Sequence, residues 1–246
     1  MSEFAAEFIG TMILVLLGDG VVANVCLKGT KGSNGGWIVI TMGWGLGVFT
    51  AVVVSSEFSG AHINPAVTIG LAAAKAFPLA KVPLFLIAQF LGGAAGALLV
   101  WVFYKDHYDI STDQGAILGT FATGPAIRNP LRNLLCEVIG TFVLVLAVLY
   151  TVGLKITATT GEIKVGMGAL GALPVALVVI GIGLSLGGTT GYAINPARDL
   201  GPRLIHHLVP IPNKGTSDWA YSWVPITGPI LGALLAALVC CLCRHA

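Results

Sequence analysis

The sequence predicts an all-α membrane protein, in which six tilted transmembrane helices and two re-entrant half-helices form an inverted repeat. Three observations lead to this prediction. Of the 246 residues, 56% are hydrophobic and only 10% are charged, against roughly 25% charged in a soluble domain. The tripeptide Asn-Pro-Ala occurs twice, as Asn64-Pro65-Ala66 and Asn195-Pro196-Ala197. Further motifs of the first half of the chain recur in the second half.

Six segments are apolar enough to cross a bilayer, which requires about 20 mostly apolar residues. They are Ala5–Val25, Trp37–Ser56, Val82–Tyr104, Leu134–Leu154, Val165–Leu186 and Tyr221–Cys243. The first segment contains Glu7 and Asp19, the fourth contains Glu137, and the other four contain no Asp, Glu, Lys or Arg. The three carboxylates therefore need a structural or functional explanation.

The chain is an internal duplication. The motif Glu-Phe-Ile-Gly-Thr at residues 7–11 recurs as Glu-Val-Ile-Gly-Thr at residues 137–141. Gly92 and Gly96 of the third span match Gly228 and Gly232 of the sixth. We expect a single channel domain over residues 1–246, with repeats at about 1–120 and 130–246 linked by loop 105–133. Each repeat holds three spans, an odd number, so the second must insert upside down relative to the first.

Each Asn-Pro-Ala predicts the start of a short helix. The Asn side chain caps free N–H groups, and Pro at the first position lacks an N–H that would otherwise be unpaired. The segments Ala66–Ala76 and Ala197–Leu208 would each be roughly 17 Å long, about half of a hydrocarbon core of about 30 Å. The inverted repeat brings them in from opposite faces, with their N-termini meeting at the midplane. The alternative, two surface helices, is disfavoured because the copies occupy matching positions in the two halves.

The meeting point of two helix N-termini has a specific chemistry. Each end places about half a unit of positive charge at the midplane, and Asn64 and Asn195 direct amide N–H donors there. Cations and hydronium are repelled. The preceding backbone is non-helical, which is tolerated at this depth only inside protein or beside a cavity. Its carbonyls are predicted to form two ladders of acceptors for small uncharged solutes, from Gly60, Ala61, His62, Ile63, Gly191, Tyr192, Ala193 and Ile194.

In its spans, its duplication and both extended Asn-Pro-Ala motifs, the whole chain resembles the major intrinsic protein family, the aquaporins and glycerol facilitators. The resemblance implies a right-handed bundle of six helices around two half-helices. It also implies a homotetramer with one pore per subunit, spanning the cell membrane with both termini in the cytoplasm. The implied partners are the lipid bilayer and small neutral solutes, glycerol and water among them.

The family's outer constriction is built from four positions, which here are Trp44, Gly183, Tyr192 and Arg198. Water-selective members usually carry His at the position of Gly183 and Phe at that of Trp44, whereas glycerol-conducting members resemble this chain. The resemblance therefore implies a selectivity filter with two aromatic faces for the C–H edge of a polyol. Arg198 would offer forked donors to the hydroxyl groups. Asp199, which follows Arg198, also resembles the glycerol branch.

The remaining polar residues of the spans have mainly structural interpretations. Glu7 and Glu137 are expected to accept hydrogen bonds from the unwound backbone beside the half-helices. Asp199 is expected to give structural support, and it is a possible ion-pair partner of Arg198. Asp19 has no counterpart in the second half. It lies near the interface, is hydrogen-bonded between helices, or lines the outer vestibule.

Trp37 is a candidate for the interfacial aromatic belt. Cys240, Cys241 and Cys243 lie at the end of the last span. They are either acylation sites or small apolar residues that simply end the helix.

Several other classes of function are disfavoured. The chain has no basic tract for nucleic acid, no cofactor motif and no Ser/His/Asp set, so it is not expected to be an enzyme. His206 and His207 are neighbours that point in different directions on a helix, so no metal site is expected. An ion-coupled transporter needs an ionisable group near the midplane, where this chain has Asn64 and Asn195.

The sequence does not identify the solute. The alternatives to glycerol are a strict water channel, or a facilitator chiefly for protonated lactic acid, hydrogen peroxide, urea or dihydroxyacetone.

Overall fold

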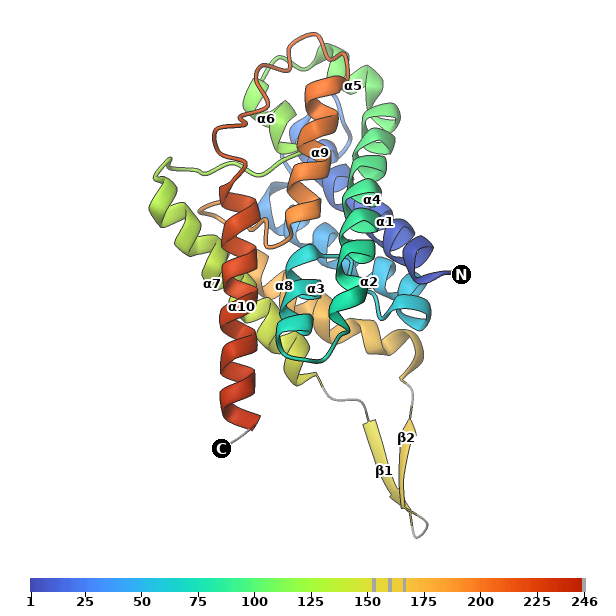
Figure 1. Ribbon diagram of the computed structural model, residues 1–246. Coiled ribbons are helices and arrows are strands. Elements are labelled where there is room, and N and C mark those ends of the chain that lie inside the picture. Colours follow the sequence, from blue (N-terminus) through green and yellow to red (C-terminus); the bar gives the residue numbers. More distant parts are fainter. Residues whose placement is uncertain (152–153, 159–160, 166, 245–246) are drawn as a thin grey trace.

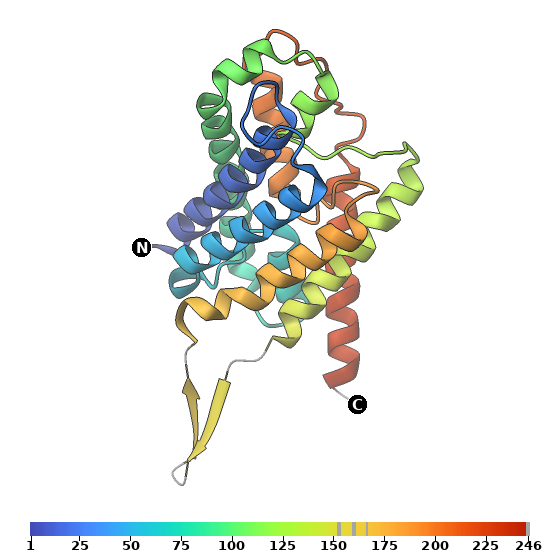
Figure 2. The same ribbon diagram turned by 180° about the vertical axis from the view of Figure 1, so that it is seen from behind.

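A computed structural model describes residues 1–151, 154–158, 161–165 and 167–244. Within them, six helical segments are long and apolar enough to cross a membrane, and they correspond to the six predicted spans (Figures 1 and 2). They contain the helices α1 (Glu3–Cys26), α2 (Gly36–Ser59), α4 (Val82–Phe103), α7 (Pro130–Tyr150), α8 (Leu173–Leu186) and α10 (Val224–Arg244), and the fifth segment, Gly168–Leu186, also includes the 3₁₀ turn that precedes α8. A short 3₁₀ turn, η1 (Leu79–Lys81), precedes α4.

Two further helices begin at the Asn-Pro-Ala motifs. They are α3 (Pro65–Ala73), with 9 residues, and α9 (Pro196–Leu208), with 13 residues. In Figure 1 they approach the middle of the bundle from its two ends. The predicted first half-helix ran too far, to Ala76. The α3 helix ends at Ala73, and Lys75 has a left-handed φ of 59° that no helix continues through.

The packing follows the predicted repeat. Helix α1 packs against α4, and α7 packs in the same way against α10. Helix α9 rests on α4, while α3 rests on α10. Each half-helix therefore lies against the third span of the opposite half, an interlocking that supports the predicted inverted symmetry.

Matched glycines permit the close helix crossings. A Cβ added at Gly92 of α4 would lie 2.3 Å from the Phe8 carbonyl oxygen of α1. A Cβ at Gly232 of α10 would lie 2.3 Å from the Val138 carbonyl oxygen of α7. The backbones are thus in direct contact at both crossings, as is usual where small residues bring membrane helices together.

The loop between the two repeats contains structure that the sequence analysis did not predict. Helices α5 (Lys105–Ile110) and α6 (Gln114–Gly119) fold over one end of the bundle. The buried side chains of Tyr108, Ile117 and Phe121 join a second hydrophobic cluster there. These apolar residues pack loop 105–133 against α1 and α4.

The connection between α7 and α8 also differs from the prediction. It contains an antiparallel hairpin of β1 (Leu154–Ala158) and β2 (Gly161–Val165), with Leu154 paired to Val165 and Ala158 to Gly161. A 3₁₀ turn, η2 (Gly168–Ala172), leads into α8. The hairpin projects from the end of the bundle opposite α5 and α6 (Figures 1 and 2).

The predicted spans Leu134–Leu154 and Val165–Leu186 were therefore too long at their facing ends, where residues 152, 153 and 166 lie outside the described part. Hydropathy averages over a window, so it included apolar residues of the hairpin. It also missed that Pro174, in the first turn of α8, favours a helix start there.

We predict that Gly232→Ala will lower the thermal unfolding midpoint of the detergent-solubilised protein, because its methyl group would overlap the Val138 carbonyl. Overpacking of this kind costs about 1–3 kcal/mol. The matched control is Gly181→Ala on α8, where an added Cβ meets nothing within 4 Å. If both variants melt at the wild-type temperature, the α7–α10 crossing is not as tight as described.

Candidate solute pathway

Two cavities meet inside the bundle. The larger has a volume of about 390 Å³ and extends from Thr151 and Gly168 past both Asn-Pro-Ala motifs. The smaller has a volume of about 220 Å³ and lies toward α6. Trp44, Tyr192 and Arg198 line both cavities. The boundary between the two cavities therefore lies at three of the four residues expected to form the constriction.

At the centre of the bundle, each of the two Asn side chains is hydrogen-bonded to the other half of the chain. Asn64 Oδ1 accepts a hydrogen bond from Ala66 N at 2.9 Å, and its Nδ2 donates to the Ile194 carbonyl at 2.8 Å. Asn195 Oδ1 accepts from Ala197 N at 3.1 Å, and its Nδ2 donates to the Ile63 carbonyl at 2.8 Å. Each Asn caps its own half-helix and bonds to the unwound segment of the other half.

The unwound segments have an unusual backbone. The φ angles of Ala61 and Ile63 are 53° and 44°, and those of Tyr192 and Ile194 are 37° and 41°. Left-handed φ is uncommon for residues other than Gly, and it is a genuine outlier for a β-branched residue such as Ile. Such a conformation costs about 1–3 kcal/mol for each residue.

The residues of the two predicted carbonyl ladders all border the cavities. Gly191 lines the smaller one, and the others line the larger one: Gly60, Ala61, His62, Ile63, Tyr192, Ala193 and Ile194.

Glu7 of α1 holds the first unwound segment. Its Oε1 accepts from His62 N at 2.9 Å and from Ser59 Oγ at 2.6 Å. Its Oε2 accepts from Ile63 N at 2.7 Å and from Gln89 Nε2 at 2.8 Å. The side chain is fully buried. A carboxylate is tolerated at this depth because each of its oxygens receives two hydrogen bonds.

Glu137 of α7 holds the second unwound segment in the same way. Its Oε1 accepts from Ala193 N at 3.0 Å and from Thr190 Oγ1 at 2.7 Å, and its Oε2 accepts from Ile194 N at 2.8 Å. The two carboxylates therefore contact equivalent backbone positions in the two halves. This equivalence supports the predicted repeat.

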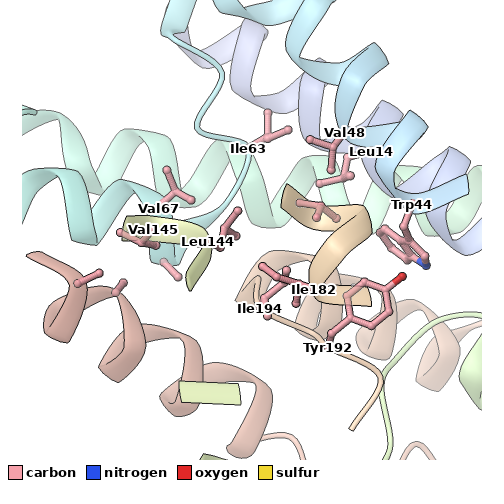
Figure 3. Packing of buried hydrophobic residues seen from close by; sticks show 14 of the residues in the cluster. Leu14, Trp44, Val48, Ile63, Val67, Leu144, Val145, Ile182, Tyr192 and Ile194 are labelled. Carbon is pink, nitrogen blue, oxygen red and sulfur yellow. The ribbon is translucent and has the colours of Figure 1, made fainter. Parts of the chain in front are cut away.

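The residues expected to form the filter lie together. A Cβ at Gly183 would lie 2.9 Å from Tyr192 Cζ, so the absence of a side chain makes room for the tyrosine ring. In Figure 3 that ring lies beside Trp44, with its hydroxyl oxygen on the side of the indole. The Arg198 guanidinium carbon lies 4.0 Å from the centroid of the Trp44 ring. One indole face is thus covered by the guanidinium, which differs from the two free aromatic faces we expected.

Trp37 lies next to the residues expected to form the constriction, although the sequence analysis placed it only in the aromatic belt. Its Nε1 donates to the Gly183 carbonyl at 2.8 Å, and its ring meets Tyr192 edge-on with centroids 5.8 Å apart. A signal for this position was available, because Trp37 precedes Trp44 by two helical turns and so shares its face of α2.

Asp199 supports the start of α9. It accepts from Thr123 N and Thr123 Oγ1, both at 2.7 Å. It also forms a buried ion pair with Arg203, whose Nε lies 2.8 Å from Asp199 Oδ1. The alternative in which Asp199 pairs with Arg198 is therefore wrong. Thr123 was not among the predicted site residues, since its contact with Asp199 depends on how loop 105–133 folds back.

Within the described part of the chain, Asp19 is not hydrogen-bonded between helices, which was one of the alternatives we considered for it. Its side chain is fully buried, and among the described residues neither carboxylate oxygen has a hydrogen-bond partner. Asp19 Oδ1 lies 3.7 Å from Arg198 Nη1, an atom that also lacks a hydrogen-bond partner among the described residues. The carboxylate therefore faces the constriction from behind the guanidinium.

Comparison with known proteins decides the family. Residues 1–240 match the sequence profile described as "Major intrinsic protein". The chain belongs to the major intrinsic protein family. With its six apolar helices, it is a multi-pass membrane protein.

Individual relatives of this major intrinsic protein cover nearly its full length. A probable glycerol uptake facilitator protein of Thermotoga maritima is 56% identical over 229 residues, which are 93% of this chain and 94% of that protein. A glycerol uptake facilitator protein of Streptococcus pneumoniae is 52% identical with the same coverage. The X-ray structure of the aquaglyceroporin from Plasmodium falciparum superposes with a TM-score of 0.81 at 34% identity, covering 99% of this chain and 98% of that one.

The described residues of this family member show no group of three or more His, Cys, Asp or Glu able to hold a metal ion. His206 is fully buried, and its Nδ1 lies 2.8 Å from Ser217 Oγ, whereas His207 packs edge-on against Trp219. The two histidines have separate surroundings and do not converge on a common point.

We predict that Glu137→Gln will destabilise the protein, because an amide cannot accept all the hydrogen bonds that the carboxylate oxygens receive. Leaving a buried N–H unsatisfied costs about 1–3 kcal/mol, so the unfolding midpoint should fall by several degrees. Glu57→Gln on the exposed end of α2 is the control and should melt like the wild type. Equal midpoints for all three proteins would contradict the role given to Glu137.

Proposed function

We propose that the protein is a passive channel for glycerol and other small neutral solutes, including water. The observation behind this proposal is the boundary between the two cavities. There, Trp44, Tyr192 and Arg198 converge while Gly183 leaves room beside the tyrosine. Relatives more than 50% identical over nearly the whole chain are named glycerol uptake facilitators. A facilitator is a transporter rather than an enzyme.

The filter selects by size and by hydrogen bonding. A linear polyol has an alkyl edge and a hydroxyl edge. The ring of Tyr192 offers an apolar surface to the first, and the guanidinium of Arg198 offers donors to the second. The Tyr192 hydroxyl lacks a hydrogen-bond partner among the described residues. It adds a donor and acceptor within the filter.

The midplane excludes protons and cations. The N-termini of α3 and α9 meet there, and together they present a local positive potential. Asn64 and Asn195 each keep one N–H for the solute, so a passing oxygen accepts hydrogen bonds from both. The carbonyls of the unwound segments replace hydration on either side, so passage involves no tight binding step.

A strict water channel is the main alternative, and Gly183 argues against it. A side chain there would collide with Tyr192 and Thr41, whose atoms lie 2.9 Å and 2.8 Å from an added Cβ. The observed geometry thus depends on the lack of a side chain. Protonated lactic acid, hydrogen peroxide, urea and dihydroxyacetone remain candidate solutes for the same filter.

The cellular setting is also a proposal. Many large apolar side chains on the outside of the bundle are exposed, Ile38, Val102 and Leu238 among them. Contact with lipid, and with neighbouring copies in a homotetramer, would cover them. We place the protein in the cell membrane with both termini in the cytoplasm, which puts the β1–β2 hairpin on the cytoplasmic side.

We predict that proteoliposomes containing the protein will reswell quickly in a glycerol gradient, with a low activation energy, while holding an imposed pH gradient. The physical reason is a path of carbonyl acceptors with a positive centre. Light scattering measures reswelling, and an entrapped pH dye measures proton leak. Glycerol flux equal to that of empty vesicles, together with rapid water flux, would move the protein to the water-channel alternative.

We predict that Gly183→His will reduce glycerol flux by about tenfold or more, equivalent to roughly 1.4 kcal/mol of added barrier, while water flux is largely kept. The imidazole would push Tyr192 into the pore. The control is Gly188→His, in an exposed turn where an added Cβ meets nothing within 4 Å. A folded Gly183→His channel that passes glycerol at the wild-type rate would show that residue 183 does not set the constriction.

A further inference from the structure

The width of the constriction depends on where the ring of Tyr192 points. The Tyr192 hydroxyl lacks a hydrogen-bond partner among the described residues, so no polar contact there anchors the far end of the ring. The backbone of Tyr192 has a left-handed φ of 37°, which fixes only the start of the side chain. Because a side chain has several staggered rotamers, packing must select the one that the constriction uses.

Helix α8 limits the ring on one side without any side chain. A Cβ added at Gly183 would lie 2.9 Å from Tyr192 Cζ, and a Cβ added at Gly187 would lie 2.4 Å from Tyr192 Cδ1. The ring therefore rests directly on the backbone at the end of α8. The position of that backbone then decides how far the ring reaches toward Trp44 (Figure 3).

Trp37 of α2 contacts both the ring and the backbone on which it rests. Its ring meets the Tyr192 ring edge-on, with an interplanar angle of 78° and centroids 5.8 Å apart. Its Nε1 donates to the Gly183 carbonyl at 2.8 Å. A Cβ added at Gly187 would lie 2.9 Å from Trp37 Cζ2. One indole thus spans the last turn of α8 and packs against the tyrosine that lies on it.

The hydrogen bond to Gly183 has a clear physical use. Helix α8 ends at Leu186, so the Gly183 carbonyl is one of its last four. The last four carbonyls of a helix need partners from outside the regular helical pattern. The indole N–H supplies such a partner, and it ties the end of α8 to the start of α2.

The predicted repeat provides an independent argument. Counted back from the Asn of each Asn-Pro-Ala motif, the position equivalent to Tyr192 in the first half is Ala61. The position equivalent to Trp37 in the second half, counted in the same way, is Gly168. Ala61 and Gly168 both line the larger cavity. The half of the pathway that has no aromatic ring at the tyrosine position therefore has none at the tryptophan position either. Such a joint replacement is expected if Trp37 supports Tyr192.

We propose that Trp37 is a specificity-determining residue of the channel, which holds the Tyr192 ring in place and so limits the size of the solutes that pass. It is a positioning residue, because it acts through Tyr192 and the end of α8. The inference rests on the proposed channel function, and it adds to it a residue outside the four expected filter positions.

The test compares the permeability of proteoliposomes to glycerol and to erythritol, a four-carbon polyol, with both measured by reswelling. Trp37→Leu removes the indole ring and its N–H, so the Tyr192 ring gains room to turn away from Trp44. We expect the erythritol-to-glycerol permeability ratio to rise about fivefold, as the loss of one edge-to-face aromatic contact predicts. Trp37→Phe keeps an aromatic ring but no donor, and its ratio should lie between those of Trp37→Leu and the wild type.

The matched control is Trp223→Leu. The exposed fractions of Trp37 and Trp223 are similar, 39% and 43%, but Trp223 lines neither cavity. A tryptophan that serves only in the interfacial belt anchors its helix at the membrane surface. Its loss affects the stability of the protein and not its choice of solute, so Trp223→Leu should keep the wild-type ratio. An equal rise in both leucine variants would overturn the proposal.

A double-mutant cycle tests whether Trp37 acts through the tyrosine. In a Tyr192→Ala background, Trp37→Leu should change the ratio by less than about twofold, because the ring on which it acts is gone. A change as large as in the presence of Tyr192 would contradict the proposal.

The remaining outcomes are also decisive. A Trp37→Leu channel that conducts glycerol with the wild-type ratio overturns the proposal. If Trp37→Leu does not assemble, Trp37→Phe decides: a raised ratio supports the proposal, and an unchanged ratio overturns it. If neither variant assembles, the residue is needed for folding rather than for selection, and the proposal is wrong. Failure of the wild-type protein to pass glycerol would instead count against the channel function, so the two proposals fail separately.

Discussion

The structure depends on giving hydrogen-bond partners to non-helical backbone at the centre of a membrane protein. An unpaired N–H group in such a place costs several kcal/mol. Glu7 and Glu137 meet this need by accepting hydrogen bonds from His62, Ile63, Ala193 and Ile194. Charge-assisted hydrogen bonds contribute about 1.5–3 kcal/mol each, against a strain of about 1–3 kcal/mol for each left-handed residue. The two energies are comparable, so the carboxylates are sufficient to hold the strained segments.

The placement of the residues that we propose as the filter follows from that support. Tyr192 lies between Thr190 and Ala193, both of which are bonded to Glu137, and it has a left-handed φ itself. Its ring direction is therefore set by a backbone that the carboxylate holds. The position of Arg198 is set in turn by α9, whose first turn is capped by Asn195. Positioning of the proposed filter thus begins with Glu137 of α7.

Much of this arrangement was predictable from the sequence, because it depends on local rules and on repetition. The six spans follow from hydropathy, the half-helix starts from Asn-Pro, and the roles of Glu7 and Glu137 from their repeated context. The β1–β2 hairpin was not predicted, because the apolar residues at its base, Leu154 and Val165, were assigned to the flanking spans. Three contacts were also missed: that of Trp37 with Gly183, that of Asp19 with Arg198, and that of Thr123 with Asp199. They join elements far apart in the chain, and no local pattern reports which side chains will face each other.

The two halves share their backbone support and differ in their charges, and the difference has a physical reason. Both halves contain an unwound segment whose equivalent N–H groups have no partner within a helix, so both keep a buried glutamate and an Asn cap. A channel needs only one narrow point to select its solutes, because the highest of several barriers in series sets the permeability of the whole pathway. One end of the pathway therefore carries Arg198, and it carries Asp19 behind the guanidinium. The equivalent positions of the other half are Val67 and Leu149, which pack into the hydrophobic cluster and add no charge.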